Sequence, residues 1–274
     1  MSIRPVPAAP ALPVAVSPHR AWVALAFLVL FAAYEAPEGL GGRLLGNATL
    51  AAVLMVSFHA VAWGVGRGLG YRNGFHAYAL EWRPRALLPA LAGMLVLKPL
   101  SLFVGAALGW VRIQPLASPP QASTVAVAAL GLLVTTFVPS LAEDIVARGF
   151  WLRAWPVAGR GVGYVLFSAA CFVLTHVYRL GKGPMEWLML FSLGLAFAAA
   201  AARTGSLWGA VGLHWGWNLA NGGMDLVVDV TPVGGWMPVL SAVTGLVALG
   251  WVVLLPPWST AASTGSSVPR DPGE

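Results

Sequence analysis

The stretch AVAALGLLVTTFVPSLAEDIVARGFWLRAW, residues 126–155, places charged side chains inside a long apolar segment. Glu143 and Asp144 are adjacent, and Arg148 lies four positions after Asp144. About 20 apolar residues in a helix are enough to cross a bilayer, so this stretch predicts a membrane span with charges inside it. Because a charge at the bilayer centre costs roughly 2.5–3.5 kcal/mol on insertion scales, these three side chains need partners or a function.

The composition of the whole chain points to a membrane protein. Of its 274 residues, 58% are hydrophobic and 9% are charged, and the mean hydropathy is +0.76. Soluble domains carry about 25% charged residues. We therefore expect an all-α, polytopic membrane helix bundle with the lipid bilayer as its surroundings. The net charge of +6 would suggest a nucleic-acid partner in a soluble protein, but here the basic residues set topology and no nucleic-acid partner is expected.

Eight apolar spans can be traced along the chain, which predicts about eight transmembrane helices. They cover about 20–35, 48–66, 86–110, 123–155, 161–178, 186–203, 204–222 and 236–255. Residues 1–18 and 256–274 are rich in proline, alanine or serine, and we expect both segments to be disordered. The sequence thus predicts one transmembrane domain over residues 19–255.

The lysines and arginines predict how the chain is oriented. With the N-terminus in the cytoplasm, the segments on the inner side hold ten of these residues and the outer loops hold four. The inner residues are Arg4, Arg20, Arg67, Arg72, Arg83, Arg85, Arg153, Arg160, Arg203 and Arg270, and the outer ones are Arg43, Arg112, Arg179 and Lys182. Positive residues favour the cytoplasmic side, so both termini are predicted to be cytoplasmic.

The charges inside the fourth span have a structural and a functional interpretation. Asp144 and Arg148 share a helix face and can pair, and such a pair could simply hold two helices together. Glu143 is rotated by about 100° from Asp144 on a helix, so it needs a different partner. Lys98, in the third span beside Pro99, could line a cavity, pair with an acid or mark a break in the helix.

Three further polar residues lie in the later spans, and they favour a functional interpretation. His176 is in the fifth span, and His214 and Asn218 are four residues apart in the seventh, hence on one helix face. At about 1.5 Å per residue, they fall at a depth similar to that of Glu143. This agreement requires residues 149–155 to be helical, with Arg153 extending to the membrane interface.

A carboxylate and two imidazoles near one another are suited to hydrolysis. Glu143 could be the general base that activates a water, and His176 could hold that water. His214 and Asn218 could donate hydrogen bonds to the carbonyl oxygen as it gains charge. Asp144 and Arg148 would support this site or bind a substrate carboxylate.

Two other kinds of hydrolytic site are less well supported by the sequence. Ser140 and Cys171 lack a nucleophile signature such as G-x-S-x-G. Zinc held by Glu143, His176 and His214 is chemically possible, but the chain has no H-E-x-x-H motif. We therefore expect no metal cofactor, with zinc as the alternative.

Three motifs in order resemble the CPBP family of intramembrane proteases, which includes the type II CAAX prenyl endopeptidases and the bacterial Abi-like proteins. They are EDIVAR (143–148), FVLTH (172–176) and HWGWN (214–218). The resemblance implies that Glu143, His176, His214 and Asn218 are catalytic and that Asp144, Arg148 and Phe172 support the site or the substrate. The second acid of the first motif is usually Glu in this family, whereas this chain has Asp144.

The resemblance implies an intramembrane endopeptidase that cleaves near the terminus of a membrane-anchored protein or peptide. Residues 19–255 would form the protease domain, with its motif core at 139–222. The composition, rich in Ala, Pro and Arg, favours a bacterial inner-membrane protein. Two alternatives remain open from the residues alone: a transporter or proton relay, since buried Glu, His and Arg also mark ion pathways, and a catalytically inactive scaffold or immunity protein.

Overall fold

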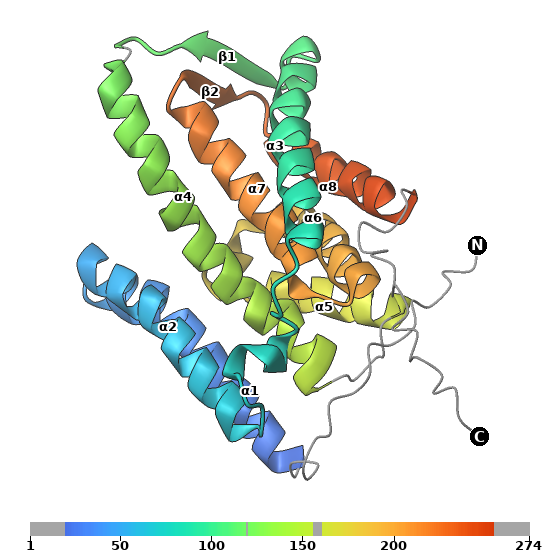
Figure 1. Cartoon of the computed structure of the whole chain (residues 1–274). Coiled ribbons are helices and arrows are strands. Elements are labelled where there is room, and N and C mark those ends of the chain that lie inside the picture. Colours follow the sequence, from blue (N-terminus) through green and yellow to red (C-terminus); the bar gives the residue numbers. More distant parts are fainter. Residues whose placement is uncertain (1–19, 119, 156–160, 255–274) are drawn as a thin grey trace, which may run out of the picture.

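The computed structural model describes residues 20–118, 120–155 and 161–254 (Figure 1). The segments predicted to be disordered, 1–18 and 256–274, lie outside these residues. Within the described residues the fold is almost entirely helical, which confirms the predicted all-α bundle. Every predicted span contains an α-helix, and the ends agree within a few residues except in the fourth, where the α-helix ends at Asp144 and a π-helix follows, and in the fifth.

The elements follow one another in a simple order. The α-helices are α1 (Arg20–Ala36), α2 (Ala48–Gly68), α3 (Pro84–Ala107), α4 (Ala122–Asp144), α5 (Val162–Leu174), α6 (Pro184–Thr204), α7 (Leu207–Asp225) and α8 (Met237–Leu254). The remaining elements are the π-helices η1 (Pro37–Leu44) and η3 (Ile145–Ala154), the 3₁₀-helices η2 (Gly74–Tyr78) and η4 (Val177–Lys182), and the strands β1 (Val111–Pro115) and β2 (Val228–Pro232).

Six helical segments of the described chain are long and apolar enough to cross a membrane. They are Arg20–Leu44, Ala48–Gly68, Pro84–Ala107, Ala122–Ala154, Pro184–Thr204 and Met237–Leu254. The α5 helix is apolar but has only 13 residues, which is shorter than the roughly 20 that a span needs. The α7 helix has 19 residues, but it carries polar and glycine residues and packs in the interior of the bundle. The α5 and α7 helices are therefore part of the bundle, but they lack the length or the apolar composition of a lipid-facing span.

The central helices pack closely because small residues lie where they meet. Figure 1 shows α7 between α3 and α4, and it packs against both. An added Cβ at Gly212 of α7 would lie 2.5 Å from the backbone oxygen of Leu87 in α3. At Gly245 of α8, it would lie 2.8 Å from the backbone nitrogen of Leu193 in α6. Small residues at such contacts allow helix backbones to approach, as is common in membrane bundles.

Lys98 lies in the contact between α3 and α7. Its side chain is buried, and its ammonium nitrogen is 4.2 Å from the centre of the Trp217 ring, the geometry of a cation–π interaction. The α3 helix continues through Pro99 to Ala107, so Lys98 does not mark a helix break. The structure thus makes it part of a helix–helix interface.

An N-terminal hairpin of α1 and α2 packs against the segment that follows α4. Phe27 of α1 contacts the rings of Phe150 and Trp151 in η3, with ring centres 5.4 and 4.5 Å apart. The Tyr78 hydroxyl, in η2, donates a hydrogen bond of 2.7 Å to the Ala62 carbonyl of α2. Burial raises the pKa of Tyr78, so its hydroxyl remains a donor and η2 stays bound to α2.

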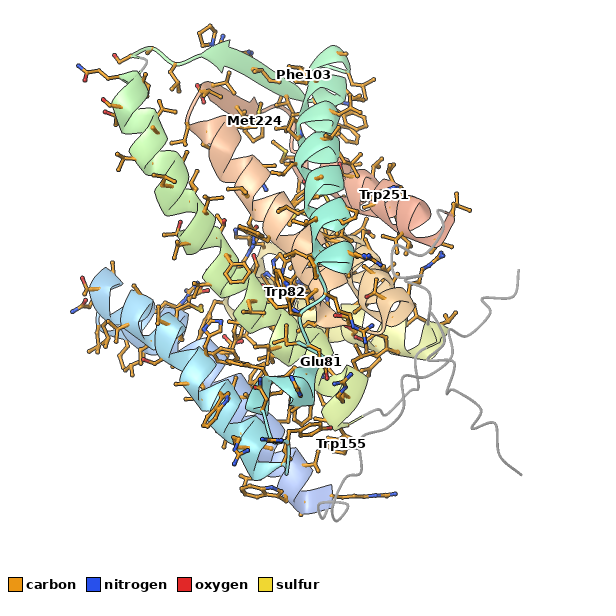
Figure 2. All side chains as sticks on the ribbon, viewed as in Figure 1. Glu81, Trp82, Phe103, Trp155, Met224 and Trp251 are labelled. Atoms are coloured by element: carbon orange, nitrogen blue, oxygen red, sulfur yellow. The ribbon has the colours of Figure 1, made fainter. Side chains whose placement is uncertain are left out.

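The connections group into two ends of the bundle, as the predicted topology requires. At one end, Arg83 donates to the Thr204 carbonyl, and Arg153 pairs with Glu81. At the other end, β1 and β2 form an antiparallel ribbon in which Val111 lies opposite Pro232. Figure 2 shows Glu81 and Trp155 toward one end of the molecule and Phe103 and Met224 toward the other. Which end faces the cytoplasm stays a prediction.

The fourth predicted span is helical to its end, but it changes type within the segment. After Asp144 the α-helix becomes the π-helix η3, which continues to Ala154. Residues 149–154 are therefore helical, as the depth comparison required. Arg153 does not extend freely to the interface: it pairs with Glu81 and donates to the His76 carbonyl. Isolated π-helical turns occur frequently at functional sites.

Candidate active site

Glu143 lies at the junction of α4 and η3, where three side chains from later elements meet its carboxylate. The Thr175 hydroxyl is 2.9 Å from Glu143 Oε1, and His176 Nδ1 is 3.2 Å from the same oxygen. His214 Nε2 is 3.6 Å from the other oxygen, Oε2. The fold therefore brings the predicted Glu143, His176 and His214 together around one carboxylate.

The fifth predicted span, 161–178, is shorter in the structure than in the sequence-based prediction. The α5 helix ends at Leu174, and His176 lies in the turn before η4. Thr175 Oγ1 is 2.9 Å from the Phe172 carbonyl, a contact within the last turn that competes with helix continuation. The expectation that His176 lies inside a spanning helix is wrong. The residue reaches Glu143 because the chain turns at that point.

The contacts of His176 determine which nitrogen carries its hydrogen. His176 Nδ1 is 2.7 Å from the Phe172 carbonyl oxygen and 3.2 Å from Glu143 Oε1. A carbonyl only accepts hydrogen bonds, so Nδ1 is the protonated nitrogen. In the neutral ring Nε2 then keeps its lone pair and can accept a hydrogen bond from a water.

His214 is held between the two adjacent acids. Its Nδ1 is 3.3 Å from Asp144 Oδ1, while Nε2 faces Glu143. The ring stacks on Phe197, with centres 5.1 Å apart and an angle of 19° between the planes, and it meets Phe172 edge-on. These contacts fix the orientation of the imidazole, as the aspartate does for the histidine of a catalytic triad.

Asp144 and Arg148 form a fully buried ion pair on one helix face, as their spacing predicted. The guanidinium lies over the ring of Phe172, 4.3 Å from its centre, and 5.1 Å from that of Phe197. Phe172 is therefore a packing partner of Arg148 and both histidines. We call Glu143, Asp144, Arg148, His176 and His214 the Glu143 cluster.

Asn218 lies one turn after His214 on α7, at the edge of this cluster. Its amide donates a hydrogen bond of 3.0 Å to Ser140 Oγ, and Ser140 donates in turn to the Thr136 carbonyl. Asn218 is thus connected to α4 one turn before Asp144, and the second hydrogen of its amide is not used in this contact. The Ser140 hydroxyl thus accepts one hydrogen bond and donates another, which does not suit a nucleophile.

Three residues near Glu143 were not singled out from the sequence. Thr175 contacts the carboxylate directly. Tyr34 and Glu35, at the end of α1, lie close enough to Glu143 to interact with it electrostatically. Thr175 is within the motif FVLTH of the fifth span, so its place beside His176 was a usable signal. Tyr34 and Glu35 carried none, because only the fold brings α1 to α4.

The candidate zinc ligands do not form a metal-holding group as they are placed. Among the described residues, no group of three or more His, Cys, Asp or Glu side chains is arranged to hold a metal ion. The His176 nitrogen that faces Glu143 is Nδ1, and it carries a hydrogen because it also faces the Phe172 carbonyl. In this orientation Nδ1 has no lone pair to offer a metal ion. A zinc ion on Glu143, His176 and His214 would require the His176 ring to reorient.

The Glu143 cluster is nearly closed to its surroundings. The Glu143 side chain is 9% exposed and that of His176 is 13% exposed, whereas Asp144 and Arg148 are completely buried. His176 is therefore the most exposed member of the cluster. A cavity of about 490 Å³ opens nearby, between η1 and Tyr178, which lies two residues after His176.

The fold and this cluster define the class: an integral membrane protein that encloses a buried group of acids and histidines. Residues 125–220 match the family model described as Type II CAAX prenyl endopeptidase Rce1-like. The matched segment contains the three motifs, so the resemblance to CPBP proteases is confirmed over this part of the chain. At a coarse level the match supports a membrane-bound hydrolase of the protease class. The comparisons with curated proteins and with solved structures gave no match.

Proposed function

We propose that the protein is an intramembrane endopeptidase in which Glu143 activates a water to hydrolyse a peptide bond near the terminus of a membrane-anchored protein or peptide. The observation that supports this most directly is the meeting of Thr175, His176 and His214 on the Glu143 carboxylate. A base surrounded by donors and buried in apolar helices can hold a single water in a defined position.

The first step would be attack of the water on the substrate carbonyl. Glu143 takes a proton from the water as its oxygen bonds to the carbonyl carbon. His176 faces Glu143 with Nδ1 in this structure, so its ring must turn for Nε2 to accept a hydrogen bond from the same water. Thr175 donates to Glu143 and limits the rotation of the carboxylate, so that one oxygen points toward the water.

The second step would be breakage of the carbon–nitrogen bond. The carbonyl oxygen gains negative charge during attack, and His214 Nε2 with the free Asn218 amide hydrogen can donate to it. This role requires hydrogens on both nitrogens of His214, since Nδ1 faces Asp144. Glu143 then passes its proton to the leaving amine, which restores the starting carboxylate.

The arrangement favours hydrolysis over a proton relay. A relay requires titratable groups that follow one another across the membrane. Here the two histidines approach one carboxylate from two different elements, the turn after α5 and helix α7, and Arg148 is committed to Asp144. An inactive scaffold with the same fold is the alternative that an activity measurement must test.

The decisive test is cleavage in liposomes, with a library of tagged, membrane-anchored peptides as substrates. We expect the wild type to cleave some members, and Glu143→Gln and His176→Ala to lose at least about a hundredfold in rate, the range of a general base. Asp229→Asn is the control, because this acid is exposed on β2 away from the cluster. Thermal unfolding of each variant separates lost chemistry from lost folding.

Each outcome of this test has a clear meaning. Cleavage that survives a chelator and depends on Glu143 supports the glutamate mechanism. If a chelator abolishes cleavage and zinc restores it, Glu143, His176 and His214 act as metal ligands instead. A wild type that cleaves nothing, or a folded Glu143→Gln variant that cleaves like the wild type, rejects the proposal.

A further inference from the structure

The cavity next to the Glu143 cluster is lined by the end of α1, by η1 and by Tyr178. Its volume of about 490 Å³ is within the range of pockets that bind small ligands or several side chains. The Tyr178 ring is packed over Gly39, where an added Cβ would lie 2.1 Å from the Tyr178 hydroxyl. The cavity is therefore an open groove beside the Tyr178 ring, and most of its lining outside its charged residues is small or apolar.

Glu35 is the charged group of this cavity that has no partner of its own. It lines the cavity, and its Oε1 is buried without a hydrogen-bond partner among the described residues. Arg43 also lines the cavity, but it is already engaged. Its guanidinium pairs with Glu38 at 2.8 Å, donates to the Tyr178 carbonyl at 3.3 Å and lies over the Tyr178 ring.

The electrostatic surroundings of Glu35 are negative. The charged groups that act on it most strongly are two other acids, Glu143 and Glu38. A buried acid without a partner that is repelled by neighbouring acids is relieved by a positive charge placed beside it. Glu35 itself is close enough to Glu143 to interact with it electrostatically, so the cavity lies close to the candidate catalytic carboxylate.

We propose that this cavity is a substrate subsite in which Glu35 binds a lysine or arginine side chain within about three residues of the scissile bond, roughly 10 Å of extended peptide. The inference rests on the proposed endopeptidase function, because it names the substrate residue that the same site selects. The residues that form this subsite lie mainly before residue 125, outside the segment that matches the family model. The selectivity is therefore a property of this chain's N-terminal hairpin and Tyr178.

The test measures peptide binding first, so that it does not depend on cleavage. The protein is the full chain with Glu143→Gln, in lipid nanodiscs. The probes are fluorescent, membrane-anchored hexapeptides of alanine and leucine, with one lysine at each position in turn. Each has a counterpart with norleucine in place of lysine. We expect lysine at one position, or two adjacent positions, to lower Kd roughly tenfold or more, the effect of a charge-assisted hydrogen bond.

Glu35→Gln in the same background should abolish the preference for lysine, whereas Asp229→Asn should keep it. Glu35→Lys should reverse the preference, so that a peptide with glutamate at that position binds better than its lysine form. This reversal guards against a variant that merely fails to fold. If no position distinguishes lysine from norleucine, or if the preference persists in Glu35→Gln, the subsite assignment is wrong.

Cleavage by the wild type then separates this proposal from the one on which it rests. A wild type that cleaves peptides with no preference for a basic residue retains the endopeptidase function and rejects the subsite. A lysine preference in binding, without cleavage of any peptide, supports the subsite as a binding site and rejects the endopeptidase function.

Discussion

Asp144 is the residue on which most of the candidate site depends. It neutralises the buried guanidinium of Arg148 and contacts Nδ1 of His214. Arg148 already has two buried nitrogens, Nε and Nη2, with no hydrogen-bond partner in the part of the chain that the structure describes. Loss of Asp144 would leave this charge in the bundle with only the faces of Phe172 and Phe197 to stabilise it.

We therefore predict that Asp144→Asn lowers the free energy of unfolding by about 3–5 kcal/mol, the cost of breaking one side of a buried ion pair. Denaturation in mixed detergent micelles measures this change. The control is the double variant Asp144→Leu with Arg148→Met, which removes both charges and should be more stable than the single variant. A single variant as stable as the wild type would show that the pair is not needed for folding.

At this scale the sequence predicted those contacts that follow from helix spacing or from a motif. The Asp144–Arg148 pair follows from a separation of four residues, and the motifs indicated Glu143, His176 and His214. The contact of Thr175 with Glu143 and the nearness of Tyr34 and Glu35 to it depend on where separate helices end and meet. The catalytic role of each residue stays a prediction, and so does the consequence of having Asp144 where Glu is usual.

Among the elements, α7 positions the second histidine, and its place is set by a glycine. Gly212 lies two residues before His214, and its hydrogen faces the α3 backbone. An added Cβ would be 2.5 Å from the Leu87 oxygen and 2.7 Å from the Ala90 Cβ. Neither α3 atom belongs to a flexible side-chain end, so the two helices must separate to accommodate a methyl group.

Gly212→Ala is therefore expected to reduce stability by about 1–3 kcal/mol, as overpacking does, and to reduce cleavage because His214 moves away from Glu143. Gly223→Ala is the matched control: it lies on the same helix, and an added Cβ there meets nothing within 4 Å. Both variants would be compared by thermal unfolding and by kcat/KM. Equal effects of the two changes would contradict a role for the α3–α7 approach.

Element boundaries show where prediction from the sequence was sufficient and where it failed. Apolar run length located the helices, because each span must satisfy its backbone inside the bilayer. Apolar run length did not predict the change from α- to π-helix at Ile145. It also did not predict the early end of α5. The ribbon of β1 and β2 was also missed, since its strands lie more than a hundred residues apart and were predicted to be outer loops.

On the scale of the whole molecule, the polar contacts separate the connections into two ends. The predicted orientation places the ribbon end outside and the end with Glu81 and Arg153 in the cytoplasm. Arg112 and Asp229 on the ribbon and Arg72 before η2 are exposed, so they can report on this orientation.

We predict that single cysteines replacing Arg112 or Asp229, in a Cys171→Ala background, react with a membrane-impermeant maleimide added to intact cells. A cysteine replacing Arg72 should react only after the membrane is opened. The opposite pattern would reverse the orientation while keeping the fold. Labelling of Arg112→Cys and Asp229→Cys from different sides would contradict the ribbon itself.

The cation–π contact between Lys98 and Trp217 also has a consequence for membrane insertion during synthesis. Ribosomes add about 5–20 residues per second, so α3 is complete roughly ten seconds before α7 emerges. During this interval the ammonium of Lys98 lacks its aromatic partner, and the newly inserted α3 carries a charge in the hydrocarbon layer. We therefore expect the nascent chain to depend on the insertion machinery or on lipid phosphates to shelter α3 until α7 is inserted. Slow translation between the two helices should lower the yield of protein by lengthening that exposure.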